Sequence, residues 1–166
     1  MQLLWPQVLV DTATVLLEEV RAKHLHIVTA ESCTGGLVAA LLTEIPGSSD
    51  VFDRGYVTYS NEAKHQELQV PLNIIQQHGA VSEPVAAKMA EGARIASETQ
   101  LAVSITGIAG PGGGTKEKPV GMVCFGLSTK NQTQAHTHLF TGSRNQIRLL
   151  AVEQALNYLR QAASLL

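Results

Sequence analysis

The segment at residues 101–106 constrains the fold most, because its side chains are apolar almost without interruption. A strand with one buried face alternates between apolar and polar residues, whereas a strand covered on both faces does not. Helical patterns, with apolar residues three or four apart, occur at residues 6–23, 82–96 and 145–163. Helices that alternate with covered strands predict a layered α/β domain.

Shorter patterns complete the expected sheet. Residues 25–30 and 55–59 are rich in β-branched and aromatic side chains, which favours strands. Residues 120–129 and 134–140 predict a hairpin, so the sheet should be mixed. Short helices are expected over residues 37–42, 60–68 and 72–78, with Ser60 as the N-cap of the second. No repeat or linker divides the chain, and residues 1–166 are expected to form one domain.

Charge and composition exclude several functions. Twelve basic and fourteen acidic residues give a net charge of −2, so no strong field favours nucleic acid or an anionic membrane. No apolar run approaches the ~18 residues of a membrane span, and residues 1–10 lack the basic start of a signal peptide. The two cysteines, Cys33 and Cys124, form no CxxC pair and are expected to be reduced. These features predict a cytoplasmic protein.

The first candidate site is the sequence TAESCTGG at residues 29–36. A strand ends there, small hydroxyl residues follow, and two glycines open a helix. Unpaired N–H groups at a helix start can bind an anion or a developing oxyanion. A hydroxyl on such a turn can be a nucleophile, although the GxSxG pattern is absent. An ordinary hydroxyl N-cap with a closely packed glycine would give the same pattern.

The second candidate site is the loop after the strand at residues 101–106. Five glycines occur within residues 107–114. Glycines let the backbone approach a ligand closely, as in a phosphate cradle. The loop matches neither a Walker A motif nor GxGxxG, and a mobile surface loop would have the same composition.

A nucleophilic serine needs a base. The histidine pairs 24/26 and 136/138 could bind a metal, but exposed or hydrogen-bonded histidines are the expected outcome, and no metal site is predicted. Lys64 is the other candidate base, and it can serve only if burial or a nearby cation lowers its pKa. Its neighbours are polar, so periodicity alone favours a solvated helix face.

Several longer blocks follow one another in a particular order and spacing. They are AESCTGG (30–36), GSS (47–49), GYVTYSNEAK (55–64), GAVSE (79–83), TGIAGPGG (106–113) and KPVG (118–121). Over residues 10–160 this arrangement resembles the CinA C-terminal domain family. The chain lacks the separate molybdopterin-binding-like domain of full-length members, and it is similar to the stand-alone nicotinamide-nucleotide amidases. The resemblance implies a three-layer α/β/α sandwich with a mixed, mostly parallel sheet.

The resemblance also implies an activity. It is hydrolysis of nicotinamide mononucleotide to nicotinic acid mononucleotide and ammonia, in pyridine-nucleotide recycling, without cofactor or metal. Ser32 would be the nucleophile, Lys64 the base and Tyr59 an assisting hydroxyl. The only partner implied is the small nucleotide substrate, and the protein is expected to be a homo-oligomer.

The two candidate sites divide the binding roles. Amides of Thr34, Gly35 and Gly36 are candidates for the oxyanion site, because they open a helix. The phosphate or ribose is expected at the second site, formed by Thr106, Gly107, Gly110 and Gly112. The alternative is a catalytically silent nucleotide-binding or sensor module of the same fold. Such a module should have lost at least one of the three residues that the family uses, and this chain keeps all three.

Overall fold

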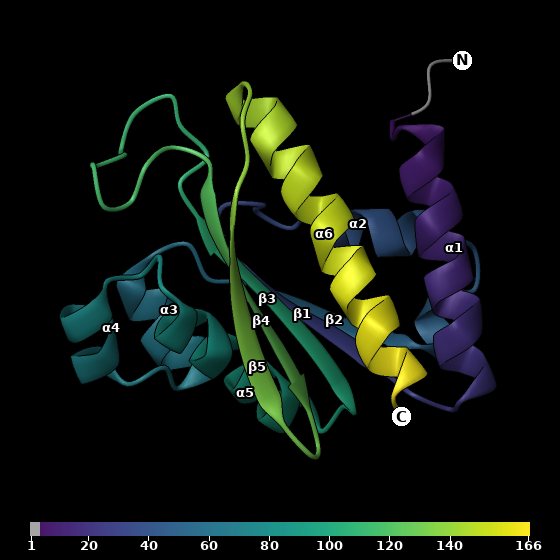
Figure 1. The fold of residues 1–166 in the computed structure, drawn as a ribbon. Coiled ribbons are helices and arrows are strands. Elements are labelled where there is room, and N and C mark those ends of the chain that lie inside the picture. Colours follow the sequence, from purple (N-terminus) through teal and green to yellow (C-terminus); the bar gives the residue numbers. More distant parts are fainter. Residues whose placement is uncertain (1–3) are drawn as a thin grey trace.

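A five-stranded sheet lies at the centre of the computed structural model, which describes residues 4–166 (Figure 1). Its strands run in the order β2-β1-β3-β4-β5. They are β1 (Ile27–Glu31), β2 (Phe52–Val57), β3 (Leu101–Gly107), β4 (Met122–Thr129) and β5 (Thr133–Leu139). Strand β1 pairs in parallel with β2 and β3, whereas β4 pairs antiparallel with β3 and β5. The mixed sheet is confirmed, with two of its four pairings parallel.

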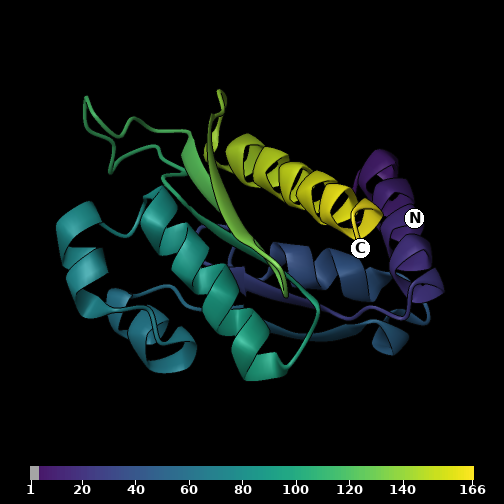
Figure 2. The same cartoon turned by 60° about the horizontal axis from the view of Figure 1, so that its bottom comes forward.

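Helices cover both faces of the sheet, which gives the three layers visible in Figure 2. One face is covered by α1 (Gln7–Ala22), α2 (Leu37–Glu44) and α6 (Arg144–Ser164). The other face is covered by α3 (Asn61–Leu68), α4 (Leu72–His78) and α5 (Glu83–Ser97). A 3₁₀ turn, Ser48–Asp50, precedes β2. Strand β3 is buried through its first six residues, as its apolar sequence predicts.

Hydroxyl caps fix where three helices begin. The side chains of Ser60, Ser82 and Ser143 accept hydrogen bonds from backbone amides in the first turns of α3, α5 and α6. Strand β2, in contrast, ends two residues earlier than its aromatic and β-branched sequence predicts. Thr58 still donates its amide to the carbonyl of Glu31, and the chain then turns into α3. Two carbonyls are thereby released from the sheet beside α3.

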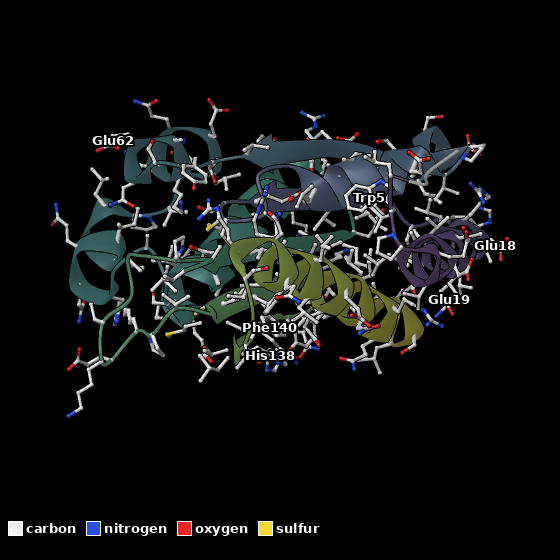
Figure 3. The ribbon with its side chains drawn as sticks, turned by 90° about the horizontal axis from the view of Figure 1, so that it is seen from above. Trp5, Glu18, Glu19, Glu62, His138 and Phe140 are labelled. Atoms are coloured by element: carbon white, nitrogen blue, oxygen red, sulfur yellow. The ribbon has the colours of Figure 1, made fainter. Side chains whose placement is uncertain are left out.

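The antiparallel side of the sheet carries an aromatic cluster that includes His136 and His138. His138 and Phe140 stack with ring centroids 5.6 Å apart beside α6 (Figure 3). His138 Nε2 lies 2.6 Å from the Tyr158 hydroxyl, so this histidine is hydrogen-bonded, as expected. Within residues 4–166 no three His, Cys, Asp or Glu side chains gather as a metal site, and no helix is long and apolar enough to cross a membrane.

Candidate active site

Ser32 and Lys64 meet at the carboxyl ends of two neighbouring parallel strands. Ser32 follows β1 directly, and Lys64 lies in the first turns of α3, which follows β2. Ligand sites of open α/β sheets form at this edge, because loops from adjacent strands converge there. Lys64 Nζ lies 3.1 Å from Ser32 Oγ, within hydrogen-bond distance. The fold therefore brings two residues 32 apart in sequence into contact, in the arrangement that a serine nucleophile and its base would need.

Burial makes Lys64 unusual. Its side chain is only 1% exposed, and within residues 4–166 no carboxylate forms an ion pair with it. The alternative of a solvated helix face is therefore wrong, because α3 turns Lys64 and Leu68 inward, one turn apart. Removal from water disfavours the ammonium, which lowers the pKa of Lys64 from 10.5 to about 8. A lysine with this pKa can act as a base near neutral pH.

Two backbone carbonyls orient the Lys64 amine. Nζ lies 2.8 Å from the carbonyl oxygen of Thr58 and 3.4 Å from that of Tyr59. A carbonyl oxygen only accepts, so a neutral amine points its two N–H bonds at these two atoms. Its lone pair is then left for the third neighbour, the hydroxyl of Ser32. Because β2 ends early, the carbonyls of Thr58 and Tyr59 are free to orient the Lys64 amine toward Ser32.

The pair opens into a pocket of about 300 Å³. The residues of the second predicted site, namely Thr106, Gly107, Gly110 and Gly112, all line it together with Ser32, Tyr59 and Lys64. The glycine-rich loop that forms one wall projects beyond the end of the sheet (Figure 1). Thr106 is buried and donates its hydroxyl to the carbonyl of Ala80, which ties this wall to the segment before α5. The structure therefore joins both sequence motifs in one pocket.

The first turn of α2 is arranged differently from the sequence expectation. The amide of Gly35 donates to the carbonyl of Ser32, and the amide of Gly36 donates to the buried carboxylate of Glu31. Neither glycine lines the pocket, nor does Thr34. A buried carboxylate at a helix start satisfies the free N–H groups and the helix dipole there. The expected oxyanion role of the Gly35 and Gly36 amides is therefore contradicted, since both donors are already used.

Tyr59 contacts Lys64 through its backbone carbonyl and not through its hydroxyl. Its side chain lines the pocket but is 63% exposed, and its hydroxyl lies 3.4 Å from Arg144 Nη2. The hydroxyl forms no hydrogen bond with Ser32 or Lys64 among the described residues. This geometry places Tyr59 at the mouth of the pocket, where it can contact a ligand.

Cys33, the neighbour of Ser32, is a poor nucleophile in this setting. Burial raises the pKa of its thiol to about 12, so the reactive thiolate is scarce near neutral pH. Cys33 and Cys124 are both free and buried.

Sequence reasoning missed three charged residues near the turn. Arg144, the first residue of α6, lines the pocket and donates Nη1 to the carbonyl of Gly110 at 2.7 Å. Arg148, one turn later, donates to the carbonyls of Cys33 and Thr34. Glu31 caps α2 from inside the protein. The Ser143 cap predicts the start of α6. The sequence around it does not show that the first turns of this helix contact Cys33 and Thr34, more than 100 residues earlier.

Fold and site together define an α/β/α sandwich protein with a buried serine–lysine pair at the carboxyl edge of its parallel strands. The chain belongs to the CinA C-terminal domain family, whose model matches residues 10–163. It is 48% identical over 151 residues to a putative competence-damage inducible protein of Caldicellulosiruptor bescii, covering 88% of this chain and 37% of that protein. A CinA-like protein of Syntrophobacter fumaroxidans is 49% identical, with 86% of this chain and 34% of the relative covered. The chain thus spans about a third of the curated relatives it matches.

Solved structures of the family share the whole fold. The competence/damage inducible protein CihA of Agrobacterium tumefaciens matches with a TM-score of 0.94 and 43% identity, over 99% of both chains. A CinA superfamily protein of Escherichia coli matches with a TM-score of 0.90 and 34% identity, over 98% of this chain and 94% of that one.

Proposed function

We propose that this protein is a serine amidase that hydrolyses nicotinamide mononucleotide to nicotinic acid mononucleotide and ammonia. The observation that carries the proposal is the buried Lys64 amine 3.1 Å from Ser32 Oγ, at the inner end of a cationic pocket. With a pKa of about 8, roughly a tenth of the Lys64 side chains are neutral at pH 7, against about one in 3,000 for an ordinary lysine.

In the first half of the reaction, neutral Lys64 takes the hydroxyl proton of Ser32 while Oγ attacks the carboxamide carbon. The resulting tetrahedral intermediate collapses when the C–N bond breaks. Lys64 passes its proton to the departing nitrogen, and ammonia leaves an acyl ester on Ser32. Lys64 thus carries the proton from Ser32 to the departing nitrogen.

In the second half, water attacks the acyl ester. Lys64 takes a proton from the water and returns one to Ser32 Oγ as the ester bond breaks, which releases the acid and restores the pair. Both halves of the reaction need the lone pair of Lys64 Nζ to face Ser32. The Thr58 and Tyr59 carbonyls support this, because they hold the amine in one orientation throughout.

The charge of the pocket supports an anionic substrate. Lys64 and Arg144 line it, and no acidic side chain from residues 4–166 does. Arg144 presents a guanidinium beside the glycine-rich loop, and such a fork binds phosphate oxygens in pairs. We therefore assign the phosphate of the substrate to Arg144 and the loop at Gly110 and Gly112, with the carboxamide directed toward Ser32.

Ammonia release from nicotinamide mononucleotide, measured with a chelator present, tests the proposal. Turnover should survive in Cys33→Ala and fall by at least a thousandfold in Ser32→Ala and Lys64→Ala, because each removes one member of the pair. Absence of turnover in folded wild-type protein that still binds the nucleotide would refute the amidase and favour a silent binding module.

A further inference from the structure

The turn that carries Ser32, at residues 32–36, has little conformational restriction of its own. Gly35 and Gly36 both adopt positive φ angles, +59° and +96°, in the region where glycine is favoured. A pair of glycines leaves the backbone many alternative conformations. Serine nucleophiles nevertheless need accurate placement, because a displacement of about 1 Å can reduce the rate a hundredfold. Something outside the turn must therefore hold it in place.

Glu31 holds the end of the turn and the start of α2 from inside the protein. Its carboxylate is fully buried, and it accepts hydrogen bonds from the amides of Gly36, Val38 and Ala39 at 3.0, 3.1 and 2.9 Å. Its backbone carbonyl accepts the amide of Thr58 at 2.9 Å. Because the Thr58 carbonyl in turn binds Lys64, Glu31 connects the nucleophile turn with the segment that orients the base.

Arg148 holds the same turn from α6. Its Nε donates to the carbonyl of Cys33 at 3.0 Å, and its Nη2 donates to the carbonyl of Thr34 at 3.1 Å. A planar guanidinium that binds two successive carbonyls fixes both peptide planes. Arg148 does not line the pocket, so its position gives it no contact with a bound substrate.

We infer that Glu31 and Arg148 are positioning residues that together clamp the Ser32 turn, the carboxylate through N–H groups and the guanidinium through carbonyls. The clamp acts on the placement of the nucleophile and leaves substrate binding unchanged. This inference rests on the proposed function for its turnover readout. A second readout is therefore needed that depends on Ser32 and Lys64 and does not depend on the natural substrate.

A fluorophosphonate ester supplies that readout. Ser32 Oγ attacks its phosphorus, the P–F bond breaks, fluoride leaves, and the hydroxyl proton passes to Lys64. The labelling rate, followed by intact mass, is compared between wild type, Arg148→Met and the matched control Arg160→Met. Arg160 lies on the same helix and binds Glu19 of α1, on a different part of the surface.

Arg148→Met should lower both the labelling rate and kcat about ten- to a hundredfold, with KM changed less than about threefold. The midpoint of its pH profile should stay where it is in wild type, since Lys64 keeps its surroundings. Arg160→Met should match wild type in every readout. Glu31→Gln should act in the same direction as Arg148→Met, because the amide group can no longer accept all three N–H bonds.

Equal labelling in the two arginine variants would overturn the clamp, and so would a raised KM with unchanged labelling. Labelling of wild type without turnover of the nucleotide would refute the proposed function alone, and the labelling ratio would still decide the clamp. No labelling of folded wild type would overturn both.

Discussion

Replacing Lys64 with methionine tests whether a buried ammonium costs this protein stability. Methionine keeps much of the length and volume of lysine but carries no charge. Lys64 is 1% exposed and has no carboxylate partner within residues 4–166, so no opposite charge offsets the cost of removing its ammonium from water. We expect the stability of Lys64→Met relative to wild type to be higher at neutral pH than in alkali.

The magnitude follows from the lowered pKa. A tenfold change in a protonation equilibrium corresponds to about 1.4 kcal/mol, so a fall from 10.5 to about 8 corresponds to about 3 kcal/mol. Below pH 8 both the folded and the unfolded chain carry the proton, and the folded state pays this penalty in full. Between pH 8 and 10.5 the folded state releases its proton first, so wild type gains stability as pH rises. The Lys64→Met variant has no group that titrates at this position, so its stability shows no such rise with pH.

Urea unfolding of both proteins at pH 7 and pH 10, with reductant present, isolates this effect. The loss of the Thr58 hydrogen bond in the variant costs about 1–3 kcal/mol at either pH and cancels in the comparison. Between the two pH values the difference in unfolding free energy should change by roughly 2–3 kcal/mol in favour of wild type, or about 4–12 °C in Tm. Lys130→Met, at an exposed position, should show no such change. A constant difference between Lys64→Met and wild type would refute a buried, destabilised ammonium.

Three other outcomes test the site. The kcat/KM of wild type should rise about tenfold per pH unit up to a midpoint near pH 8 and then level off, because neutral Lys64 is the reactive form. A flat profile from pH 6 to 9 would exclude Lys64 as the base. Gly112→Leu should fold normally, since a Cβ at Gly112 meets no atom within 4 Å. It should raise KM by about tenfold or more with little change in kcat. An unchanged KM would show that Gly112 is not part of the binding site. Cys33→Ser should keep kcat within about fivefold of wild type, because burial holds the thiol protonated; a loss comparable to that of Ser32→Ala in ammonia release would make Cys33 the nucleophile.

The comparison of β2 with its sequence shows where local patterns end. Composition predicted a strand over residues 55–59, whereas the structure ends it at Val57. Aromatic and β-branched residues favour extended backbone, but they do not say which extended residues still pair with a neighbour. Thr58 and Tyr59 lie just beyond the pairing, and for that reason their carbonyls are free to bind Lys64.

The sequence by itself determined the order of elements, because apolar periodicity, hydroxyl caps and glycines act over a few residues. It predicted the helix starts at Ser60 and Ser82, the covered strand β3 and the mixed sheet. The same local information singled out the two segments that now line one pocket. Local patterns offered Lys64 only as one candidate base and favoured a solvated position for it, and the resemblance between motifs was what selected Ser32 and Lys64.

Only the tertiary structure decided the chemistry of those residues. Lys64 lies in a polar segment, and its burial depends on how α3 packs against α5 and on the contacts of Lys64 with Ser32 and Thr58 beyond the strand ends, which the neighbouring residues do not encode. The amides of Gly35 and Gly36 were expected to be free, but the first donates to the carbonyl of Ser32 and the second to the carboxylate of Glu31 at the end of β1. Arg144 and Arg148 reach the site from the opposite end of the sequence. Burial, pKa and hydrogen-bond partners are set by atoms distant in sequence, so they appear only once the chain has folded.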